Sequence, residues 1–261
     1  MKYLVCIKRV PKFPNKVKID PETNNLDRSS AVSVINACDL NALTMALDLK
    51  KQTGGSVTTL TMGSPSAVGT AKECLAMGAD EAFVVSDNNF RGSDTLATSY
   101  TLAMAAKHIG DFDVVITGAQ TSDGDTGQVG PELAERLGIN QATYAKKILF
   151  KDDKFLVLRS LYNGTEKAIL KAPCLFTIIK DANEPVKLRK SKLEKISDDD
   201  VKVLSADDIS AEIEKTGANG SATDVVSIFQ DEEAAKGTFI EGDLDEQTDK
   251  LLDLFKELKL V

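Results

Sequence analysis

Residues 116–131 read Ile116-Thr-Gly-Ala-Gln-Thr-Ser-Asp-Gly-Asp-Thr-Gly-Gln-Val-Gly-Pro131 and join a strand pattern to a helix pattern. The β-branched run 113–117 predicts a buried strand. The amphipathic run 128–137 predicts a helix, with Pro131 in its first turn and Gly138 just after its end. The loop between the two runs is rich in Gly, Asp and Thr. This segment therefore predicts the strand–loop–helix unit of an α/β protein.

The composition of this loop is typical of a phosphate site. Glycines let a ligand approach the backbone closely, and free N–H groups at the start of a helix point toward an anion. The loop is not a Walker A motif, because no Gly-Lys-Ser or Gly-Lys-Thr follows, and it does not contain Gly-x-Gly-x-x-Gly. The residues alone leave two interpretations open: a nucleotide-phosphate loop, or an ordinary turn between a strand and a helix.

Strand and helix signals alternate through the first half of the chain. The expected strands are residues 2–10, 56–61, 81–86 and 113–117, and the expected helices are residues 39–51, 66–77, 94–109 and 128–137. Strands that alternate with helices of about 10–15 residues predict right-handed crossovers and a parallel sheet with helices on both faces. The expected fold class is therefore α/β, with a Rossmann-like parallel sheet.

Residues 142–179 change to strand patterns without helices between them. Residues 151–154 separate two β-branched runs, and Asn163-Gly164, a strong hairpin signal, separates two more. We expect a β-meander added to the sheet, ending in an apolar strand over residues 174–179. Residues 1–180 are then expected to form one α/β domain, which is a nucleotide-binding domain if the loop 118–128 holds a phosphate.

Residues 181–261 are expected to form an extended arm and a C-terminal helix. Residues 187–195 are basic, residues 218–223 resemble a linker, and residues 245–260 place Leu and Phe on one helical face among charges. This part is too polar to form its own core. It is either a solvated appendage or, as we favour, an arm that docks on a partner chain, because an apolar stripe needs a surface to cover it.

The charge balance excludes some classes of protein. The chain has 261 residues, with 32 Lys and Arg against 40 Asp and Glu, and a net charge of −8. This balance argues against a nucleic-acid binder and against a polybasic membrane anchor. No apolar run approaches the roughly 20 residues of a membrane span, and the N-terminus has no signal-peptide pattern. We expect a cytoplasmic protein.

Side chains suited to acid–base chemistry or metal binding are scarce. Cys6, Cys38, Cys74 and Cys174 lie far apart, so buried thiols are expected and a metal site is not. His108 is the only histidine and suits the end of a helix. No catalytic residue is assigned. Such a chain is expected to bind a reactive cofactor, because the cofactor then carries the chemistry.

Several blocks follow one another between residues 6 and 185. They are Cys6-Ile-Lys-Arg-Val-Pro11, Val17-Lys-Ile-Asp-Pro21, Val34-Ile-Asn-Ala-Cys-Asp39, Asp123-Gly-Asp-Thr-Gly-Gln-Val-Gly-Pro131, Leu158-Arg-Ser-Leu-Tyr-Asn-Gly-Thr-Glu166, Lys171-Ala-Pro-Cys174 and Asn183-Glu-Pro185. Together these blocks resemble the electron transfer flavoprotein β (small) subunit. The resemblance implies an adenine nucleotide hydrolase-like fold and an αβ heterodimer with a large α subunit that holds a redox FAD.

The resemblance also implies a second nucleotide site in this chain. The site residues that it implies are Cys6, Asn36, Ala37, Cys38, Asp39, Met62, Gly118, Gln120, Asp123, Gly124, Asp125, Thr126, Gly127, Gln128 and Val129. In one branch of the family the site holds structural AMP. In the electron-bifurcating branch it holds FAD that exchanges hydride with NAD(H), and the loop of this chain is more similar to that branch.

The chemistry of the residues agrees with a nucleotide. Asp125 and Thr126 offer a carboxylate and a hydroxyl to a ribose, a ribityl chain or bound Mg²⁺. The amides of residues 124–127, with the helix start at Gln128, suit a pyrophosphate. The amide of Asn36 can read an adenine edge. A non-redox AMP scaffold and, more remotely, a nucleotide-binding stress-type module are the alternatives.

One segment departs from the family pattern. After Pro185, many members carry an aromatic residue, a loop containing Leu and a Lys-rich run that docks the partner dehydrogenase. Here residues 186–193 read Val-Lys-Leu-Arg-Lys-Ser-Lys-Leu, a shortened version in which Leu188 is the expected anchor. The resemblance implies as partners a flavin-dependent dehydrogenase, of the acyl-CoA type by family default or of the lactate type, and, in the bifurcating branch, ferredoxin or flavodoxin.

Overall fold

The computed structural model describes residues 1–12, 18–19, 26–27, 32–226, 237 and 239–261. The chain falls into two units, Met1–Val226 and Ser227–Val261. Most of the sequence block 17–21 lies outside the described residues.

The strands of the described residues are β1 (Lys2–Cys6), β2 (Arg9–Pro11), β3 (Lys18–Ile19), β4 (Leu26–Asp27), β5 (Ser33–Ile35), β6 (Ser56–Met62), β7 (Glu81–Val85), β8 (Val114–Gly118), β9 (Asn140–Lys151), β10 (Lys154–Leu161), β11 (Gly164–Leu170), β12 (Cys174–Ile178) and β13 (Val201–Leu204). The α-helices are α1 (Ala37–Thr53), α2 (Ala67–Met77), α3 (Thr95–Ile109), α4 (Val129–Leu137), α5 (Lys190–Leu193), α6 (Gly217–Gly220) and α7 (Leu244–Glu257). The expected run 2–10 is two strands, because β2 leaves the main sheet and pairs antiparallel with β5.

The main sheet has nine strands within the described residues, in the order β11-β10-β9-β12-β8-β1-β6-β7-β13. The strands from β12 to β13 are all parallel to their neighbours, and β9 is parallel to β12. Only β9, β10 and β11 pair antiparallel with one another. The expected α/β class is confirmed, as is the parallel sheet.

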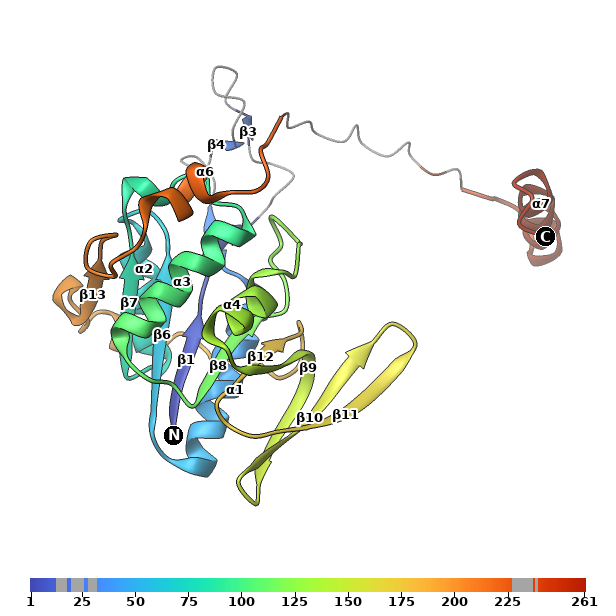
Figure 1. The fold of residues 1–261 in the computed structure, drawn as a ribbon. Coiled ribbons are helices and arrows are strands. Elements are labelled where there is room, and N and C mark those ends of the chain that lie inside the picture. Colours follow the sequence, from blue (N-terminus) through green and yellow to red (C-terminus); the bar gives the residue numbers. More distant parts are fainter. Residues whose placement is uncertain (13–17, 20–25, 28–31, 227–236, 238) are drawn as a thin grey trace. The chain divides into compact units, whose positions relative to one another are not determined.

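Helices cover both faces of the sheet (Figure 1). On the side of α1, Tyr3 and Val5 of β1 pack with Leu43 of the helix. On the opposite side, where α3 and α4 lie, Leu4 packs with Leu102 and Leu133. Successive residues of β1 thus point into two different cores. This is the burial expected of a central parallel strand.

The direction of the crossovers changes beside β1. The chain moves from β1 to β6 and β7 on one side, and then returns to β8 on the other side of β1. Open α/β sheets bind ligands at such a switch point, outside the carboxyl ends of the strands. Here the switch point lies between β1 and β8, so the fold places it where β8 runs into the loop 119–128.

The expected β-meander over residues 142–179 is wrong in the position of its last strand, β12. It does not pair with β11, which precedes it in the chain, but lies between β8 and β9 and is parallel to both. Its residues are all buried. A wholly apolar strand is more stable in the centre of a sheet, where both of its faces are covered, than at an edge. The hairpin at Asn163-Gly164 is confirmed by the pairing of β10 with β11.

The main sheet extends beyond the expected limit at residue 180. Strand β13 pairs parallel with β7, and Lys202 of β13 makes a salt bridge of 2.7 Å to Glu81. Asp94 accepts hydrogen bonds from the backbone N–H groups of Ala222 and Thr223, which ties the end of this segment to the start of α3. These contacts place residues 201–226 with the first unit.

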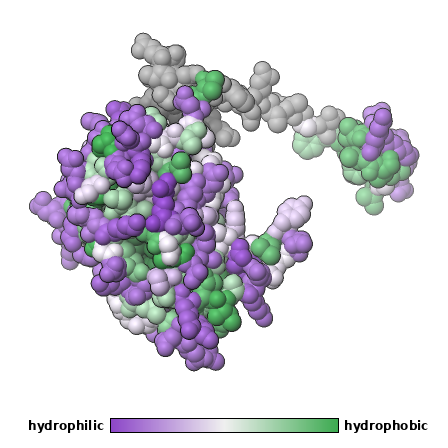
Figure 2. Space-filling view, in the orientation of Figure 1, coloured by the Kyte–Doolittle hydropathy of each residue, from purple (hydrophilic) through white to green (hydrophobic). Residues whose placement is uncertain are grey.

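In the second unit, α7 is an amphipathic helix. Asp243 caps it by accepting a hydrogen bond of 3.0 Å from the backbone N–H of Glu246. Leu244, Leu251, Phe255 and Leu258 are all exposed and share one face. Figure 2 shows green, apolar residues beside purple, charged ones on this helix. Among the helices of the described residues, none has the length and apolar character needed to span a bilayer.

Candidate functional site

Residues implied by the family resemblance meet at the switch point. Cys6 ends β1, Met62 ends β6 and Gly118 ends β8, and these three strands are neighbours. Cys6 and Met62 belong to the core on the side of α3. Asn36, Ala37, Cys38 and Asp39 form the start of α1 on the other side. The fold thus gathers residues from four separate segments around one edge of the sheet.

Asp39 connects these segments. Its Oδ2 accepts a hydrogen bond of 2.7 Å from the backbone N–H of Lys8, just after β1. Its Oδ1 accepts one of 3.1 Å from the backbone N–H of Gly118 and one of 3.0 Å from the side-chain amide of Asn36. The residue is 4% exposed. The carboxylate therefore ties the ends of β1 and β8 to the start of α1.

The same burial changes the acidity of this carboxyl. Burial raises the pKa of Asp39 to about 7. The hydrogen bonds from Lys8, Asn36 and Gly118, together with the charge of Lys8, lower this pKa, but their effect is smaller than that of burial. The ordinary value is 3.8, so the folded chain holds this proton more tightly than the unfolded chain. The contribution of Asp39 to stability is therefore greatest below about pH 4 and is lost as the pH rises to about 7.

Asp39→Asn is expected to remove this pH dependence. Relative to the variant, the unfolding free energy of the wild-type chain should fall by up to about 1.4 kcal/mol per pH unit between roughly pH 4 and pH 7. Urea unfolding of both proteins at intervals from about pH 4.5 to about pH 7.5 measures the difference. Because the variant also loses a hydrogen-bond acceptor, a constant offset is expected on top of the slope. Parallel pH profiles would contradict the raised pKa.

Asn36 is already occupied by the protein. Its side-chain amide donates to Asp39 and, over 2.9 Å, to the carbonyl oxygen of Gln120, and the residue is 2% exposed. Both N–H groups of this amide are thus used inside the fold. Asn36 is placed to hold the loop and Asp39 in position, and this differs from the arrangement expected for reading an adenine edge.

A salt bridge also anchors the loop. Nζ of Lys8 lies 2.8 Å from Oδ1 of Asp123, whose side chain is only 7% exposed. Asp123 thus faces the end of β1 rather than solvent. The side chain of Lys8 is 46% exposed, so solvent partly screens the charge of this pair. Asp39 and Asp123 thus anchor the loop at its start. Residues 124–126, which follow Asp123, are exposed.

The exposed part of the loop presents backbone amides. Asp125 and Gly127 have φ values of 51° and 65°, which lie in the left-handed region. The amide of Asp125 donates to the carbonyl of Thr121 over 2.9 Å. Within the described residues, the amides of Thr126 and Gly127 have no hydrogen-bond partner. Two of the four expected phosphate donors, Thr126 and Gly127, are therefore fully available.

The start of α4 is also available. Gln128 is its N-cap residue, yet its side chain does not cap the helix. The Oε1 of Gln128 instead accepts a hydrogen bond of 2.9 Å from the hydroxyl of Thr95. The amides of Val129 and Gly130 are thus the free N–H groups expected at a helix start. An anion in front of them would also gain from the helix dipole.

Cys6 and Cys38 border this site as uncharged thiols. Burial raises the pKa of Cys6 to about 12, and the nearby charge of Asp39 adds to the effect. Burial also raises the pKa of Cys38. Both residues therefore act as small apolar groups rather than as nucleophiles at neutral pH.

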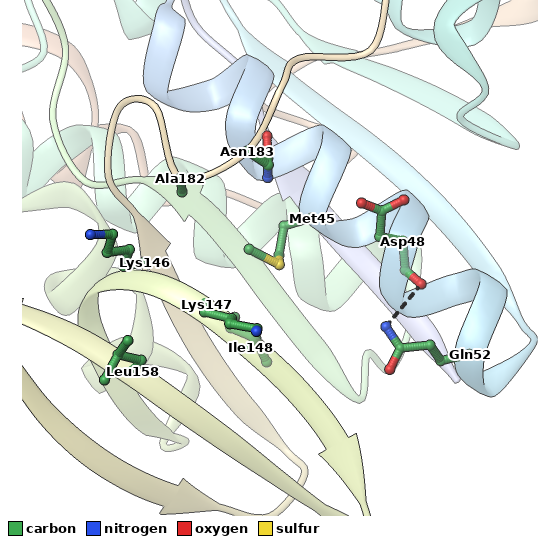
Figure 3. Close-up of a pocket in the computed structure, with 9 residues that line it drawn as sticks. All are labelled: Met45, Asp48, Gln52, Lys146, Lys147, Ile148, Leu158, Ala182 and Asn183. Atoms are coloured by element: carbon green, nitrogen blue, oxygen red, sulfur yellow. Dashed lines mark hydrogen bonds between the residues drawn. The ribbon is translucent and has the colours of Figure 1, made fainter.

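One cavity borders this site, and another lies elsewhere in the first unit. A cavity of about 220 Å³ borders the site and is lined by Cys38, Ala119, Gln120, Tyr144, Ile179 and Lys180. A larger one, of about 360 Å³, lies away from the strand ends, between α1, β9 and β10 (Figure 3). Its lining mixes Met45 and Ile148 with the charged Asp48 and Lys147, and it contains none of the expected site residues.

Sequence reasoning missed three residues that border the site. Lys8 stands in the quoted block 6–11, but nothing in that block indicates its partner Asp123. Tyr144 and Lys180 line the smaller cavity and come from β9 and from the segment just after β12. Their place depends on where β12 and β9 enter the sheet, and no local pattern could have indicated it.

Known proteins match this chain over most of its length. The family model of the electron transfer flavoprotein domain matches residues 23–207. The chain is 39% identical over 254 residues to the electron transfer flavoprotein subunit beta of Thermoanaerobacterium thermosaccharolyticum, a match that covers 97% of each chain. It is 38% identical over 263 residues to the caffeyl-CoA reductase-Etf complex subunit CarD of Acetobacterium woodii, covering 100% of each chain.

A third relative is the acryloyl-CoA reductase electron transfer subunit gamma of Anaerotignum propionicum. The identity is 38% over 262 residues, with 97% of each chain covered. These matches extend over the strand–helix series, the loop 119–128 and the C-terminal helix. By its fold, its matched domain and its full-length relatives, this chain belongs to the electron transfer flavoprotein family, among the β subunits.

Proposed function

We propose that this chain binds FAD at the switch point and exchanges electrons with NAD(H), as the small subunit of a bifurcating electron transfer flavoprotein. The observation that carries the proposal is the pair of free amides at Thr126 and Gly127 in front of the uncapped start of α4. A pyrophosphate there would meet backbone donors and the positive end of a helix.

The residues present fit such a group. A Cβ built on Gly124 would meet only Oγ1 of Thr121, at 3.6 Å, so the loop has open space on its outer side. Asp125 and Thr126 are exposed and can bind hydroxyl groups of a ribose or ribityl chain. FAD bound here would supply hydride and single-electron transfer. The chain itself needs only to bind and orient it, which agrees with the scarcity of acid–base side chains.

AMP is the alternative occupant. The amides and the helix start would hold its phosphate equally well, and all redox chemistry would then belong to the FAD of the large subunit. The loop sequence Gly124-Asp-Thr126 favours FAD through its resemblance to the bifurcating branch.

The partners proposed are a large α subunit, a flavin-dependent dehydrogenase and a low-potential carrier such as ferredoxin or flavodoxin. Two relatives are named as parts of caffeyl-CoA reductase and acryloyl-CoA reductase systems, which supports a dehydrogenase of the acyl-CoA type. A lactate-type enzyme is the other candidate. Leu188, which is 36% exposed in a basic segment, is the proposed docking anchor. We place this system in the cytoplasm.

Counting the flavins of the purified αβ heterodimer tests the proposal. Two FAD per heterodimer, released by denaturation and identified chromatographically, are expected, together with bleaching of one flavin on addition of NADH. Hydride transfer needs the reacting atoms about 3–3.5 Å apart, so bleaching reports a flavin that NADH can reach. One FAD and one AMP per heterodimer, with no separate NADH-reducible flavin, would assign the site to AMP.

Asp125→Ala is expected to lower nucleotide occupancy, because it removes a polar group aimed at the ligand. The loss should be about tenfold in affinity if this group is paired with the ligand. Asp152→Ala is the matched control: Asp152 has a φ of 50°, close to the 51° of Asp125, but lies in the β9–β10 turn. Both variants carry the same backbone strain. Equal nucleotide affinities in the two would remove Asp125 from the site.

His108→Ala serves as a second control for the same measurement. His108 is in the last turn of α3, whereas the start of that helix, at Thr95, faces the loop. Electron transfer from NADH should therefore be nearly unchanged in this variant. An inactive His108 variant would mean that acid–base chemistry, and not nucleotide binding, limits the reaction.

A further inference from the structure

Tyr144 lies at a β-bulge beside the site. In the pairing of β9 with β12, Ala142 stands opposite Phe176 and Ala145 stands opposite Ile178. Two residues of β9 therefore face the single residue Thr177. Tyr144 is one of the two, and its φ is 55°. A bulky side chain rarely adopts this left-handed conformation, so the backbone of Tyr144 is strained.

The bulge is held in place from two sides. The backbone N–H of Tyr144 donates to Oγ1 of Thr177 over 2.9 Å. The guanidinium group of Arg159 donates to the carbonyl oxygen of Thr143 over 2.8 Å and to its hydroxyl over 2.9 Å. Thr177 is 2% exposed. The surrounding contacts thus fix the strained conformation. Bulges of this kind occur next to binding sites, where they redirect a side chain.

The side chain of Tyr144 is only partly packed within the chain. Tyr144 is 41% exposed, whereas Tyr3 and Tyr100 are buried. The bulge lets Ala142 and Ala145 both enter the core and turns Tyr144 toward the loop. A Cβ built on Gly127 would lie 3.1 Å from the hydroxyl oxygen of Tyr144. The ring therefore reaches the loop whose amides are free.

Tyr144 also forms a wall of the cavity of about 220 Å³. The remaining lining contains Cys38 and Ala119, which are buried and apolar, together with Gln120 and Ile179. Among the described residues, Lys180 is the one charged residue that lines the cavity. The described lining contains no Asp or Glu. Pockets for whole ligands have volumes of roughly 300–1,000 Å³. This cavity is smaller and suits one flat ring system rather than a complete dinucleotide.

We propose that the cavity between Tyr144 and Cys38 receives a flat, uncharged heteroaromatic ring of the bound nucleotide, packed against the ring of Tyr144. This assignment rests on the proposed nucleotide site, since the loop beside Tyr144 would hold the phosphates. Adenine and the flavin ring share the chemistry that such a wall recognises. Tyr144 is then a binding residue whose strained backbone is retained for the ligand, rather than for the stability of the chain.

Three variants of the αβ heterodimer separate the ligand role from a structural one. Tyr144→Gly removes the ring and also relieves the backbone strain, because glycine adopts a positive φ freely. Tyr144→Phe keeps the ring. Tyr162→Gly is the matched control, since Tyr162 is fully exposed in the β10–β11 turn and lies outside the cavity lining.

Titration of each heterodimer, stripped of nucleotide, with AMP and with FAD measures the effect. Tyr144→Gly is expected to weaken binding about tenfold, the value of one aromatic pair, while Tyr144→Phe and Tyr162→Gly stay within about twofold of the wild type. The thermal midpoint of Tyr144→Gly should be unchanged or higher. Weakened binding of both ligands identifies the ring as adenine. Weakened binding of FAD alone identifies it as the flavin.

Three results would overturn the assignment in different ways. If AMP and FAD bind Tyr144→Gly as tightly as the wild type, while Asp125→Ala weakens them, the nucleotide site stands and the role of Tyr144 is wrong. If the midpoint of Tyr144→Gly falls with no loss of affinity, the residue serves the fold alone. A wild-type heterodimer that binds neither ligand would refute the nucleotide site and, with it, this inference.

Discussion

Gly118→Ala is expected to disrupt both the fold around the switch point and nucleotide binding. A Cβ at this position would lie 2.2 Å from Oδ1 of Asp39 and 2.8 Å from Cβ of Cys38. Asp39 cannot move aside freely, because three N–H groups hold it. The added methyl group must separate α1 from the end of β8. The expected loss of stability is roughly 2–4 kcal/mol, from overpacking and from broken hydrogen bonds to a buried carboxylate.

Gly69→Ala is the control for this measurement. Gly69 lies inside α2, and a Cβ added there would meet no atom within 4 Å. Alanine is favoured over glycine within a helix by about 0.5–1 kcal/mol, so this variant should be slightly more stable than the wild type. Thermal and urea unfolding of the heterodimer, together with its nucleotide content, report both effects. Wild-type stability and full nucleotide content in Gly118→Ala would show that the close contact of β8 with α1 is not required.

Removing residues 245–261 is expected to weaken association with the large subunit at least about a hundredfold. The apolar face of α7 carries Leu251, Phe255 and Leu258, and burying a few such side chains contributes about 1.5–3 kcal/mol each before the costs of association. A helix of this length is also marginal in water by itself. We therefore expect that it is stabilised by a partner surface. Calorimetric titration of the two purified subunits measures the change in affinity.

A matched pair of double variants distinguishes the apolar face from the helix as such. Leu251→Ser with Phe255→Ser should lower the affinity strongly. Asp249→Ser with Asp253→Ser alters the opposite face with the same replacement residue and should have little effect, since the salt bridge of Asp253 with Lys256 is exposed. Because Met1–Val226 forms its own unit, unfolding of that unit should not change in either variant. If the wild type, the truncated chain and both double variants bind the large subunit with equal affinity, α7 does not contact the partner and its apolar face is exposed to solvent.

Much of the architecture follows from local patterns. The runs 56–61, 81–86 and 113–117 predicted β6, β7 and β8 to within a residue or two, because they are short and rich in β-branched or apolar residues, which favour strands. Gly138 ends α4 with a positive φ value, as its position after a periodic run predicts. The hairpin at Asn163-Gly164 depends on the same kind of local preference.

The site was predicted less completely than the fold. Asp39 and Gly118 could be named from the sequence blocks, but their hydrogen bond joins residues 79 positions apart, and it makes Asp39 a buried connector rather than an exposed ligand group. Lys8 and Asp123 are 115 positions apart. Such contacts depend on the order of strands in the sheet, and a local sequence pattern contains no information about that order.

By itself the sequence determined the alternation of strands and helices, the Gly- and Asp-rich loop after β8 and the family to which the chain belongs. These properties reside in short segments, where backbone preference and the spacing of apolar residues act over a few positions. Only the tertiary structure decided that β12 enters the sheet beside β8, and this placement creates the bulge at Tyr144 and the cavity beside the loop. The reason is that strand pairing gains its free energy from contacts between segments distant in the chain. Their partners are selected only when the whole sheet is buried between its two layers of helices.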